Sequence, residues 1–375
     1  MVISIEDYAA SFGEEPGYLN FAFAGPPGRA VKDEQYAMMG LLGRARFGTI
    51  EGLVDQDARV RSAISAVTRF APEQIVFQPN TSTGLMHAMF GLTGGVALSG
   101  AEFPSVTFAA VRAAEALGAV APFWLATDHG RVTPGNLRDQ LTAEVVAVAV
   151  SLVDARTGYL ADLDGIRQVI GDRLLIVDAI QGFGVVDAPY EVADVVVSGG
   201  QKWTRAGWGT GFMALSERAA GALTPVFSGF NAAETEELPL DEILPPRSGA
   251  GAFQVTGPDP IAQARFAVAL EEIAEVGVPE INASIGERVG RVIDLADEFA
   301  IPVVSPRDLP ERAGIVVVEP PAEQLTVLTA SLFNHGVTTT TREGRVRLSP
   351  HVSTDEETFE MLRSSFVSFA SAINI

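Results

Sequence analysis

The sequence contains no cysteine in its 375 residues. Disulfides, iron–sulfur clusters, cysteine-ligated zinc and a cysteine nucleophile are therefore excluded. The lack of cysteine fits a cytoplasmic protein, because disulfides belong to oxidising compartments. The four histidines stand far apart in the chain without the spacing of metal ligands, so we expect no metal site.

Basic residues and long apolar runs are also scarce. There are 26 Lys and Arg against 47 Asp and Glu, which gives a formal net charge of −21. Such an acidic surface repels phosphate backbones and anionic lipid, and we expect neither nucleic acid nor a membrane as a partner. The longest apolar run, 145–153, is too short to cross a bilayer, and the acidic N-terminus lacks the basic start and apolar middle of a signal peptide.

Only two of the basic residues are lysines, Lys32 and Lys202. Arginine serves wherever this chain needs a surface cation. A retained lysine therefore indicates a task that arginine cannot perform, such as amine chemistry.

From about residue 73 the chain alternates short β-rich runs with helical stretches. The runs are almost continuously Val, Ile and Leu, which is typical of strands buried on both faces of a mostly parallel sheet between layers of helices. We predict strands at 75–78, 96–99, 121–127, 145–153, 174–180, 194–199 and 211–216, and helices at 83–92, 105–117 and 163–170.

The character of the chain changes after an acidic, proline-rich segment at 231–246, which we interpret as a surface excursion. The pattern beyond it predicts helices at 260–276, 278–299 and 355–372 and strands at 314–319 and 345–349. We therefore predict an α/β fold with two domains: a large one at 16–252 and a small α+β C-terminal one at 253–375. Residues 1–15 pack on the small domain or on the large one.

Lys202 follows the apolar strand 194–199 within S-G-G-Q-K-W, among glycines and tryptophans. Ligands of open α/β sheets bind beyond the carboxyl ends of the strands. A lysine there is partly desolvated, and its pKa falls from about 10.4 towards neutrality, which makes it a usable nucleophile and base. The alternative is a lysine that pairs with a carboxylate at the strand end.

Polar side chains lie at the ends of two other strands. Asp178, near the end of strand 174–180, would be costly to bury without a partner such as a protonated heteroaromatic nitrogen. Capping of the following turn is the alternative. The turn after strand 75–78 carries Thr81, Ser82 and Thr83, whose hydroxyls and free N–H groups at a helix start can bind an anion or serve as plain caps.

Two further side chains complete the set. Phe103 follows strand 96–99 and can stack on a flat ring, with core packing as the alternative. Arg347 lies on one side of a short strand with Arg345 beside it, and can bind a carboxylate in bidentate fashion or stay solvated. An anion site, a stacking aromatic, an acid for a ring nitrogen, an amine and an arginine are together what pyridoxal phosphate (PLP) and an amino-acid substrate require.

The motifs resemble the class V aminotransferase family, the fold-type-I PLP enzymes that include cysteine desulfurases, kynureninase and isopenicillin-epimerase-like proteins. The resemblance extends from about Tyr18 to Phe369. It is carried by D-A-I-Q at 178–181, S-G-G-Q-K-W at 198–203 and R-L-S-P-H at 347–351. It implies a PLP-dependent transferase-like fold, pyridoxal 5′-phosphate as the cofactor and a homodimer.

The resemblance also implies a role for each site residue. Lys202 is expected to form the Schiff base with the cofactor, Asp178 to keep the ring nitrogen protonated, and Arg347 to bind the substrate carboxylate. The other expected cofactor contacts are Gln181 at the ring hydroxyl, Phe103 on the ring face, Thr81, Ser82 and Thr83 at the phosphate, Ser198 and Gln201 beside the lysine, and Thr256, which reaches across a dimer to the phosphate.

The sequence departs from the family pattern in three places. Gln201 stands where desulfurases carry a histidine, and the T-G-P order around Thr256 reverses the usual G-T-P. The desulfurase cysteine is absent, which excludes sulfur transfer by that route. For a second substrate carboxylate the sequence offers Arg44 and Arg46, with surface placement as the alternative.

We therefore predict an aminotransferase-like enzyme that acts on a small amino acid or amine through a Schiff base at Lys202. A PLP-dependent β-eliminating or C–S lyase, or an epimerase, on the same site is the alternative. A third possibility is a non-catalytic binding protein on a PLP fold.

Overall fold

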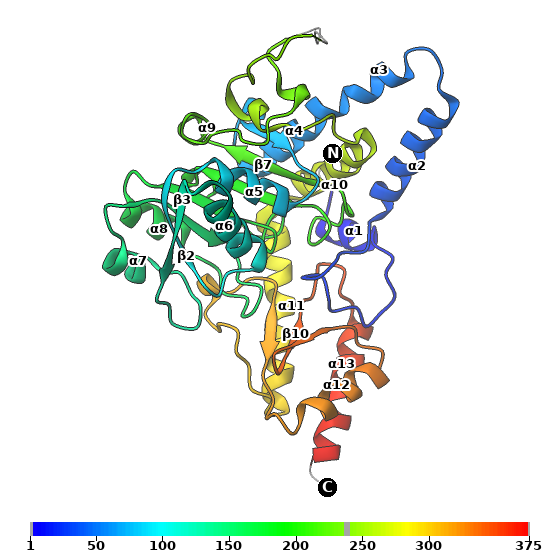
Figure 1. The fold of residues 1–375 in the computed structure, drawn as a ribbon. Helices are drawn as coiled ribbons and strands as arrows, with labels where there is room; N and C mark the ends of the chain where they lie inside the picture. Colours follow the sequence, from blue (N-terminus) through cyan, green and yellow to red (C-terminus); the bar gives the residue numbers. More distant parts are fainter. Residues whose placement is uncertain (1–2, 236–240, 374–375) are drawn as a thin grey trace.

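The computed structural model describes residues 3–235 and 241–373 (Figure 1). Residues 236–240 of the predicted excursion at 231–246 lie outside the described residues. No helix in the described part of the chain is both long enough and apolar enough to cross a membrane.

A seven-stranded sheet forms the centre of the larger part of the molecule. Its strand order is β1-β7-β6-β5-β4-β2-β3. The pairs from β6 through β5, β4 and β2 to β3 are parallel, whereas β7 is antiparallel to both β6 and β1. The strands are β1 (Ile75–Phe77), β2 (Gly94–Ser99), β3 (Val120–Leu125), β4 (Val145–Ser151), β5 (Leu174–Asp178), β6 (Val195–Gly199) and β7 (Gly211–Leu215).

Both faces of this sheet are covered by helices, which confirms the predicted α/β sandwich. Successive residues of the central strands alternate between two buried clusters, because strand side chains alternate between the faces. One cluster includes α5 (Thr81–Gly91), α6 (Pro104–Leu117) and α9 (Glu217–Ala222). The other includes α4 (Gln56–Thr68), α7 (Pro134–Gln140), α8 (Leu163–Ile170) and α10 (Pro260–Val276).

The C-terminal part carries a second, antiparallel sheet of three strands. Its order is β8-β10-β9, with β8 at Val316–Val318, β9 at Thr340–Arg342 and β10 at Arg345–Leu348. The C-terminal part also contains the helices α11 (Val278–Glu298), α12 (Leu325–Asn334) and α13 (Glu356–Ile373). Helix α10 packs on α4 and on α2 (Arg29–Arg44). The domain boundary after residue 252 therefore stays a prediction.

Periodicity found the elements of the sheet and of the C-terminal part to within a few residues, but it passed over several helices. These are α1 (Ile5–Ala10), α2, α3 (Thr49–Val54), α4, α7, α9 and α12, together with strand β9. The first two turns of α2 mix apolar and charged residues, and its side chains are largely exposed. A helix without a continuous apolar stripe gives little periodic signal.

A buried arginine joins three distant segments of the chain. Arg205, three residues after Lys202, is 1% exposed and forms an ion pair with Glu14 of the N-terminal segment. Its guanidinium also donates to the hydroxyl of Ser353 (2.9 Å) and to the carbonyl of Pro26 (2.6 Å). Phe12 lies against its face, 3.6 Å from ring centroid to guanidinium carbon. The loop that carries Lys202 is thus tied to both ends of the chain.

Removal of the Glu14 charge leaves this buried guanidinium without its counter-ion. We expect Glu14→Gln to lower the free energy of unfolding by about 3–5 kcal/mol, the range measured when one partner of a buried pair is removed. Urea denaturation would measure this change. Glu15→Gln is the matched control, because Glu15 is exposed and its loss should change the stability by less than about 0.5 kcal/mol. Equal, small effects of both substitutions would show that the pair stabilises nothing.

Candidate active site

The predicted site residues come together because several strands end at one edge of the sheet. Strands β2, β5 and β6 run parallel, and two antiparallel pairings give β1 the same direction as β6. The chain segments that follow these strands therefore meet. They enclose a cavity of about 240 Å³. Eight of the predicted site residues line it: Thr81, Ser82, Phe103, Asp178, Gln181, Gln201, Lys202 and Arg347.

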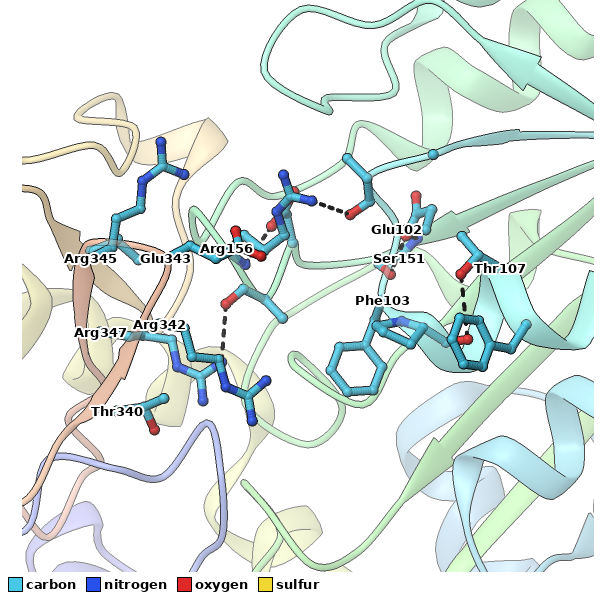
Figure 2. Close-up of a pocket in the computed structure, with 17 residues that line it drawn as sticks. Glu102, Phe103, Thr107, Ser151, Arg156, Thr340, Arg342, Glu343, Arg345 and Arg347 are labelled. Carbon is cyan, nitrogen blue, oxygen red and sulfur yellow. Dashed lines mark hydrogen bonds between the residues drawn. The ribbon is translucent and has the colours of Figure 1, made fainter.

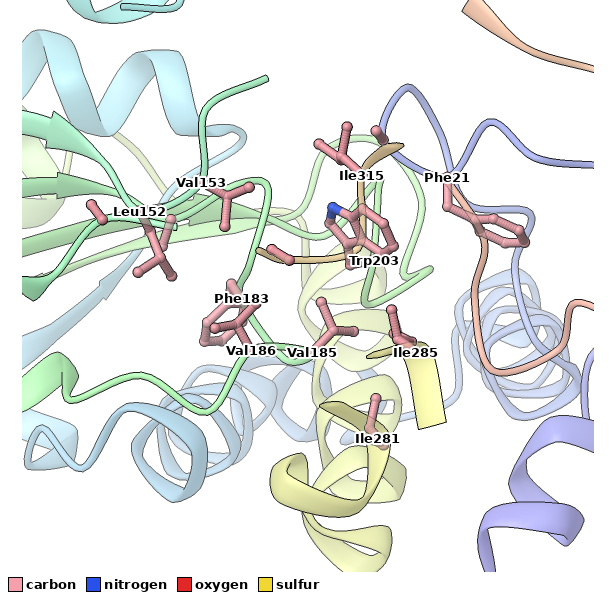
Figure 3. Close-up of a cluster of buried hydrophobic side chains, with 14 of the residues drawn as sticks. Phe21, Leu152, Val153, Phe183, Val185, Val186, Trp203, Ile281, Ile285 and Ile315 are labelled. Carbon is pink, nitrogen blue, oxygen red and sulfur yellow. The ribbon is translucent and has the colours of Figure 1, made fainter. Parts of the chain in front are cut away.

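Lys202 is held in place by its neighbours in sequence. Trp203 is 1% exposed and sits among aliphatic and aromatic side chains, including Ile285 of α11 and Phe21 of the N-terminal segment (Figure 3). On the other side, the N–H of Gly25 donates to the carbonyl of Gln201 (2.8 Å), and a Cβ at Gly25 would clash with the Lys202 carbonyl. Packing on both sides leaves the Lys202 backbone little freedom to move.

The environment of Lys202 lowers the pKa of its ammonium group. Burial is the largest cause, the positive charges of Arg347 and Arg342 add to it, and the charge of Asp178 opposes it, so that the pKa falls to about 8. The Nζ atom lies over the ring of Phe103, 5.5 Å from its centroid. A lysine with this pKa is available as a nucleophile near neutral pH.

Asp178 is the last residue of β5 and is 2% exposed. One carboxylate oxygen, Oδ1, accepts a hydrogen bond from the N–H of Ile180 (3.1 Å). The other, Oδ2, is buried without a hydrogen-bond partner among the residues that the structure describes. Burial raises the pKa of Asp178 to about 6, while the charge of Lys202 opposes this rise. A cationic donor placed at Oδ2 would satisfy this oxygen.

The turn between β1 and α5 forms the anion end of the cavity. Asn80 caps α5 by accepting the N–H of Thr83 (3.0 Å), and Ser82 shares a hydrogen bond with Ser105 (2.8 Å). The hydroxyl of Thr81 is buried without a partner in the described part of the chain. This hydroxyl and the N-terminus of an 11-residue helix are a suitable setting for a phosphate.

The side chain of Gln181 is hydrogen-bonded to two other segments of the chain. Its Nε2 donates to the carbonyl of Ala22 (3.0 Å), and its Oε1 accepts from Nε1 of Trp203 (3.0 Å). An amide nitrogen carries two hydrogens. The second N–H of Gln181 therefore remains available for a ligand oxygen.

Two arginines line the cavity together with Lys202. Arg347 of β10 donates to the carbonyl of Ala155 (3.0 Å), and its Nε is buried without a partner among the described residues. Burial, together with the neighbouring charge of Arg342, lowers the pKa of Arg347 to about 10. Arg342, at the end of β9, lines the same cavity.

Three predicted residues do not line this cavity. The hydroxyl of Thr83 donates to Asn80 within the helix cap (3.2 Å). Ser198 is fully buried inside β6, and Thr256 is exposed in the segment between η4 (Gly249–Phe253) and α10. Their predicted roles stay predictions.

Sequence reasoning missed Arg342 and Trp208, which both line the cavity. A signal for Arg342 was present in R-E-G-R-V-R. Glu343 and Gly344 both have positive φ (50° and 80°), the geometry of a two-residue hairpin turn, and Gly at the second position is typical of it. Side chains alternate between the two faces of both strands, and Arg342 pairs with Arg345. Arg342 therefore lies on the same face of the hairpin as Arg345 and Arg347.

The family model "Aminotransferase class-V" matches residues 33–368, so the chain belongs to this family of PLP-dependent enzymes. A curated relative, a probable cysteine desulfurase from Pyrococcus abyssi, is 23% identical over 254 residues, which cover 65% of this chain and 62% of the relative. The match thus spans less than two thirds of that relative's length.

Two solved structures of the enzyme C-DES share the fold. A C-DES mutant with glycine covalently linked to its PLP cofactor has a TM-score of 0.84 at 18% identity, covering 94% of this chain and 96% of that one. The complex of the cystine C–S lyase C-DES with its product cysteine persulfide has a TM-score of 0.84 at 19% identity, covering 94% and 97%. They confirm the predicted PLP-dependent transferase-like fold.

The lowered pKa of Lys202 predicts a pH profile. Only the neutral amine reacts with an acylating or arylating reagent, so labelling of Lys202 should rise with pH around a midpoint near 8. Arg347→Gln removes a positive charge from its vicinity and should move this midpoint to higher pH. Peptide mass mapping of the cofactor-free protein measures both, with exposed Lys32 as the internal reference. An unchanged midpoint in the variant would contradict the electrostatic coupling.

Proposed function

We propose that this chain is a PLP-dependent enzyme that binds an amino acid and removes its α-proton with Lys202. The observation that carries the proposal is the convergence of Lys202, Asp178 and Arg347 on one cavity at the strand ends. Membership of the class V aminotransferase family supports it.

The residues of the cavity fit the cofactor. Asp178 Oδ2 and the Thr81 hydroxyl are buried polar atoms without partners among the described residues. Such atoms destabilise a protein unless a ligand or water satisfies them. A protonated pyridine nitrogen satisfies the first and a phosphate oxygen the second. Phe103 lines the same cavity, and its aromatic ring can stack on the pyridine ring.

Each of these residues would then have its own role in removal of the α-proton. PLP supplies the electron-accepting ring that stabilises negative charge at the substrate Cα. Asp178 holds the proton on the ring nitrogen, and Arg347 orients the substrate through its carboxylate. Lys202 would hold the cofactor covalently and would take the α-proton of the bound substrate at Nζ as general base.

For the overall reaction we propose transamination, in which Lys202 would both take and return the proton. A second candidate is β-elimination with C–S bond cleavage. The likeness of this chain to C-DES, a cystine C–S lyase, favours this second candidate. The persulfide route through an enzyme cysteine stays excluded, because this chain has no cysteine.

Borohydride reduction of the PLP-loaded protein should fix the cofactor on Lys202, as read by peptide mass mapping. Labelling of Lys32 or of neither lysine would reject the site.

Asp178→Asn should keep this attachment but lower kcat by about 100-fold or more, since the ring nitrogen loses its proton partner. Without a keto-acid acceptor, transamination stops after one equivalent of keto acid, whereas elimination releases ammonia at every turnover. Steady ammonia release would reject transamination as the overall reaction and support β-elimination.

We also propose a homodimer. Helices α2 and α3 form an arm that projects from the body (Figure 1). The arm exposes large apolar side chains, among them Tyr36, Met39, Phe47, Ile50 and Val54. Arg265 connects it with the site loop by bonding to Gln35 (3.3 Å) and to the Trp208 carbonyl (2.8 Å). An exposed apolar surface of this kind marks an interaction site.

Sedimentation equilibrium should give twice the mass of the chain, and Phe47→Glu with Ile50→Glu should give the single mass. Exposed Leu309→Glu, which lies outside the arm, is the matched control and should leave the dimer intact. A monomer in the unmodified protein would contradict the proposal. The cytoplasmic location stays a prediction of the sequence.

A further inference from the structure

A second cavity, of about 360 Å³, adjoins the proposed cofactor site. The two cavities share three lining residues, Phe103, Arg342 and Arg347. Figure 2 shows Arg342 and Arg347 directed into the space that faces Phe103. A substrate held at Arg347 can therefore extend from the first cavity into the second.

The β9–β10 hairpin presents its cations to this second cavity. Arg342 pairs with Arg345, and Arg347 pairs with Thr340, so that these four alternate positions share one face of the hairpin. All four line the cavity. The intervening Val346 is fully buried in the core on the other face. The pairing of β9 with β10 therefore places Arg342, Arg345 and Arg347 on the same side of the second cavity.

A fourth arginine, Arg156, lines the cavity from the segment after β4. Of the acidic side chains there, Glu102 is held largely neutral at pH 7, because burial raises its pKa to about 8. Glu102 accepts from the N–H (3.1 Å) and hydroxyl (2.5 Å) of Ser151. Asp154 accepts the backbone N–H groups of Arg156 (2.5 Å) and Thr157 (3.1 Å). Glu343 is the third acidic residue that lines the cavity. With Glu102 largely neutral, four arginines face two carboxylates there, which leaves a net positive site in a chain of net charge −21.

Three of these four arginines form no salt bridge with a carboxylate. Within residues 3–235 and 241–373, none of Arg156, Arg342 and Arg347 has one. Arg345, by contrast, pairs with Glu319 (3.2 Å). Guanidinium groups that converge on one cavity without salt bridges suit an anionic ligand.

We infer that the substrate is a dicarboxylic amino acid. This inference rests on the proposed function. Arg347 binds the α-carboxylate, and Arg342 and Arg156 bind the carboxylate at the far end of the side chain. Phe103 and Phe108 line the same cavity and offer apolar surface to the intervening methylene groups. Arg44 and Arg46, which the sequence offered for a second carboxylate, lie at the exposed end of α2 and line neither cavity.

Equilibrium binding of unreactive analogues tests the inference without turnover. Glutarate carries two carboxylates and pentanoate carries one on a chain of the same length. Isothermal titration of the PLP-loaded protein should give glutarate an affinity about tenfold or more above that of pentanoate, as expected for an added charge-assisted interaction. Equal affinities would overturn the inference.

Substitutions locate the second carboxylate. Arg342→Gln and Arg156→Gln should each reduce the preference for glutarate about tenfold, and Arg342→Lys should restore part of it, because the charge is kept. Arg363→Gln is the control for net charge. Arg363 is exposed on α13, pairs with Glu298 and should leave both affinities unchanged. An unchanged preference in Arg342→Gln and Arg156→Gln would place the carboxylate elsewhere and overturn the assignment.

This experiment separates the two proposals. If borohydride fixes no PLP on Lys202, the proposed function fails. The same titration on the cofactor-free protein then still reports whether the arginines of the hairpin bind a second carboxylate.

Discussion

The buried ion pair between Arg205 and Glu14 is the constraint on which the site depends. A guanidinium at 1% exposure is tolerable only with a counter-ion and filled hydrogen bonds. Its partners come from residues near 14, 26 and 353. Because Arg205 lies three residues after Lys202, satisfying this charge also fixes the lysine loop between the N-terminal segment and the C-terminal part.

The active-site cavity shows how a strongly acidic chain gathers cations where an anionic substrate would bind. Burial, rather than a single neighbour, sets the chemistry: it brings Lys202 to a pKa of about 8 and raises that of Asp178 to about 6. Arg347 and Arg342 add a positive potential that favours the neutral amine. The same potential attracts carboxylates, so one arrangement would serve both the proposed base and the binding of its substrate.

Much of this site was predictable because its residues follow strands. Asp178, Lys202 and Phe103 each come just after a run of apolar residues, and parallel strands end at one edge. Arg342 escaped prediction because its place depends on the pairing of β9 with β10, and β9 has only three residues, all at least partly exposed. Ser198 and Thr83 carry suitable groups in suitable motifs, yet packing inside β6 and the cap of α5 keep them from lining the cavity.

The sequence by itself determined the layered sheet, the family and the candidate lysine. The sheet follows from apolar runs, the family from its resemblance in motifs such as S-G-G-Q-K-W, and Lys202 from its place after a strand. Tertiary structure alone decided which polar atoms lack partners, as at Asp178 Oδ2, and which arginines meet at the second cavity. Both depend on contacts between segments as distant as Arg156 and Arg342. Such contacts arise from register and packing, which periodicity does not encode.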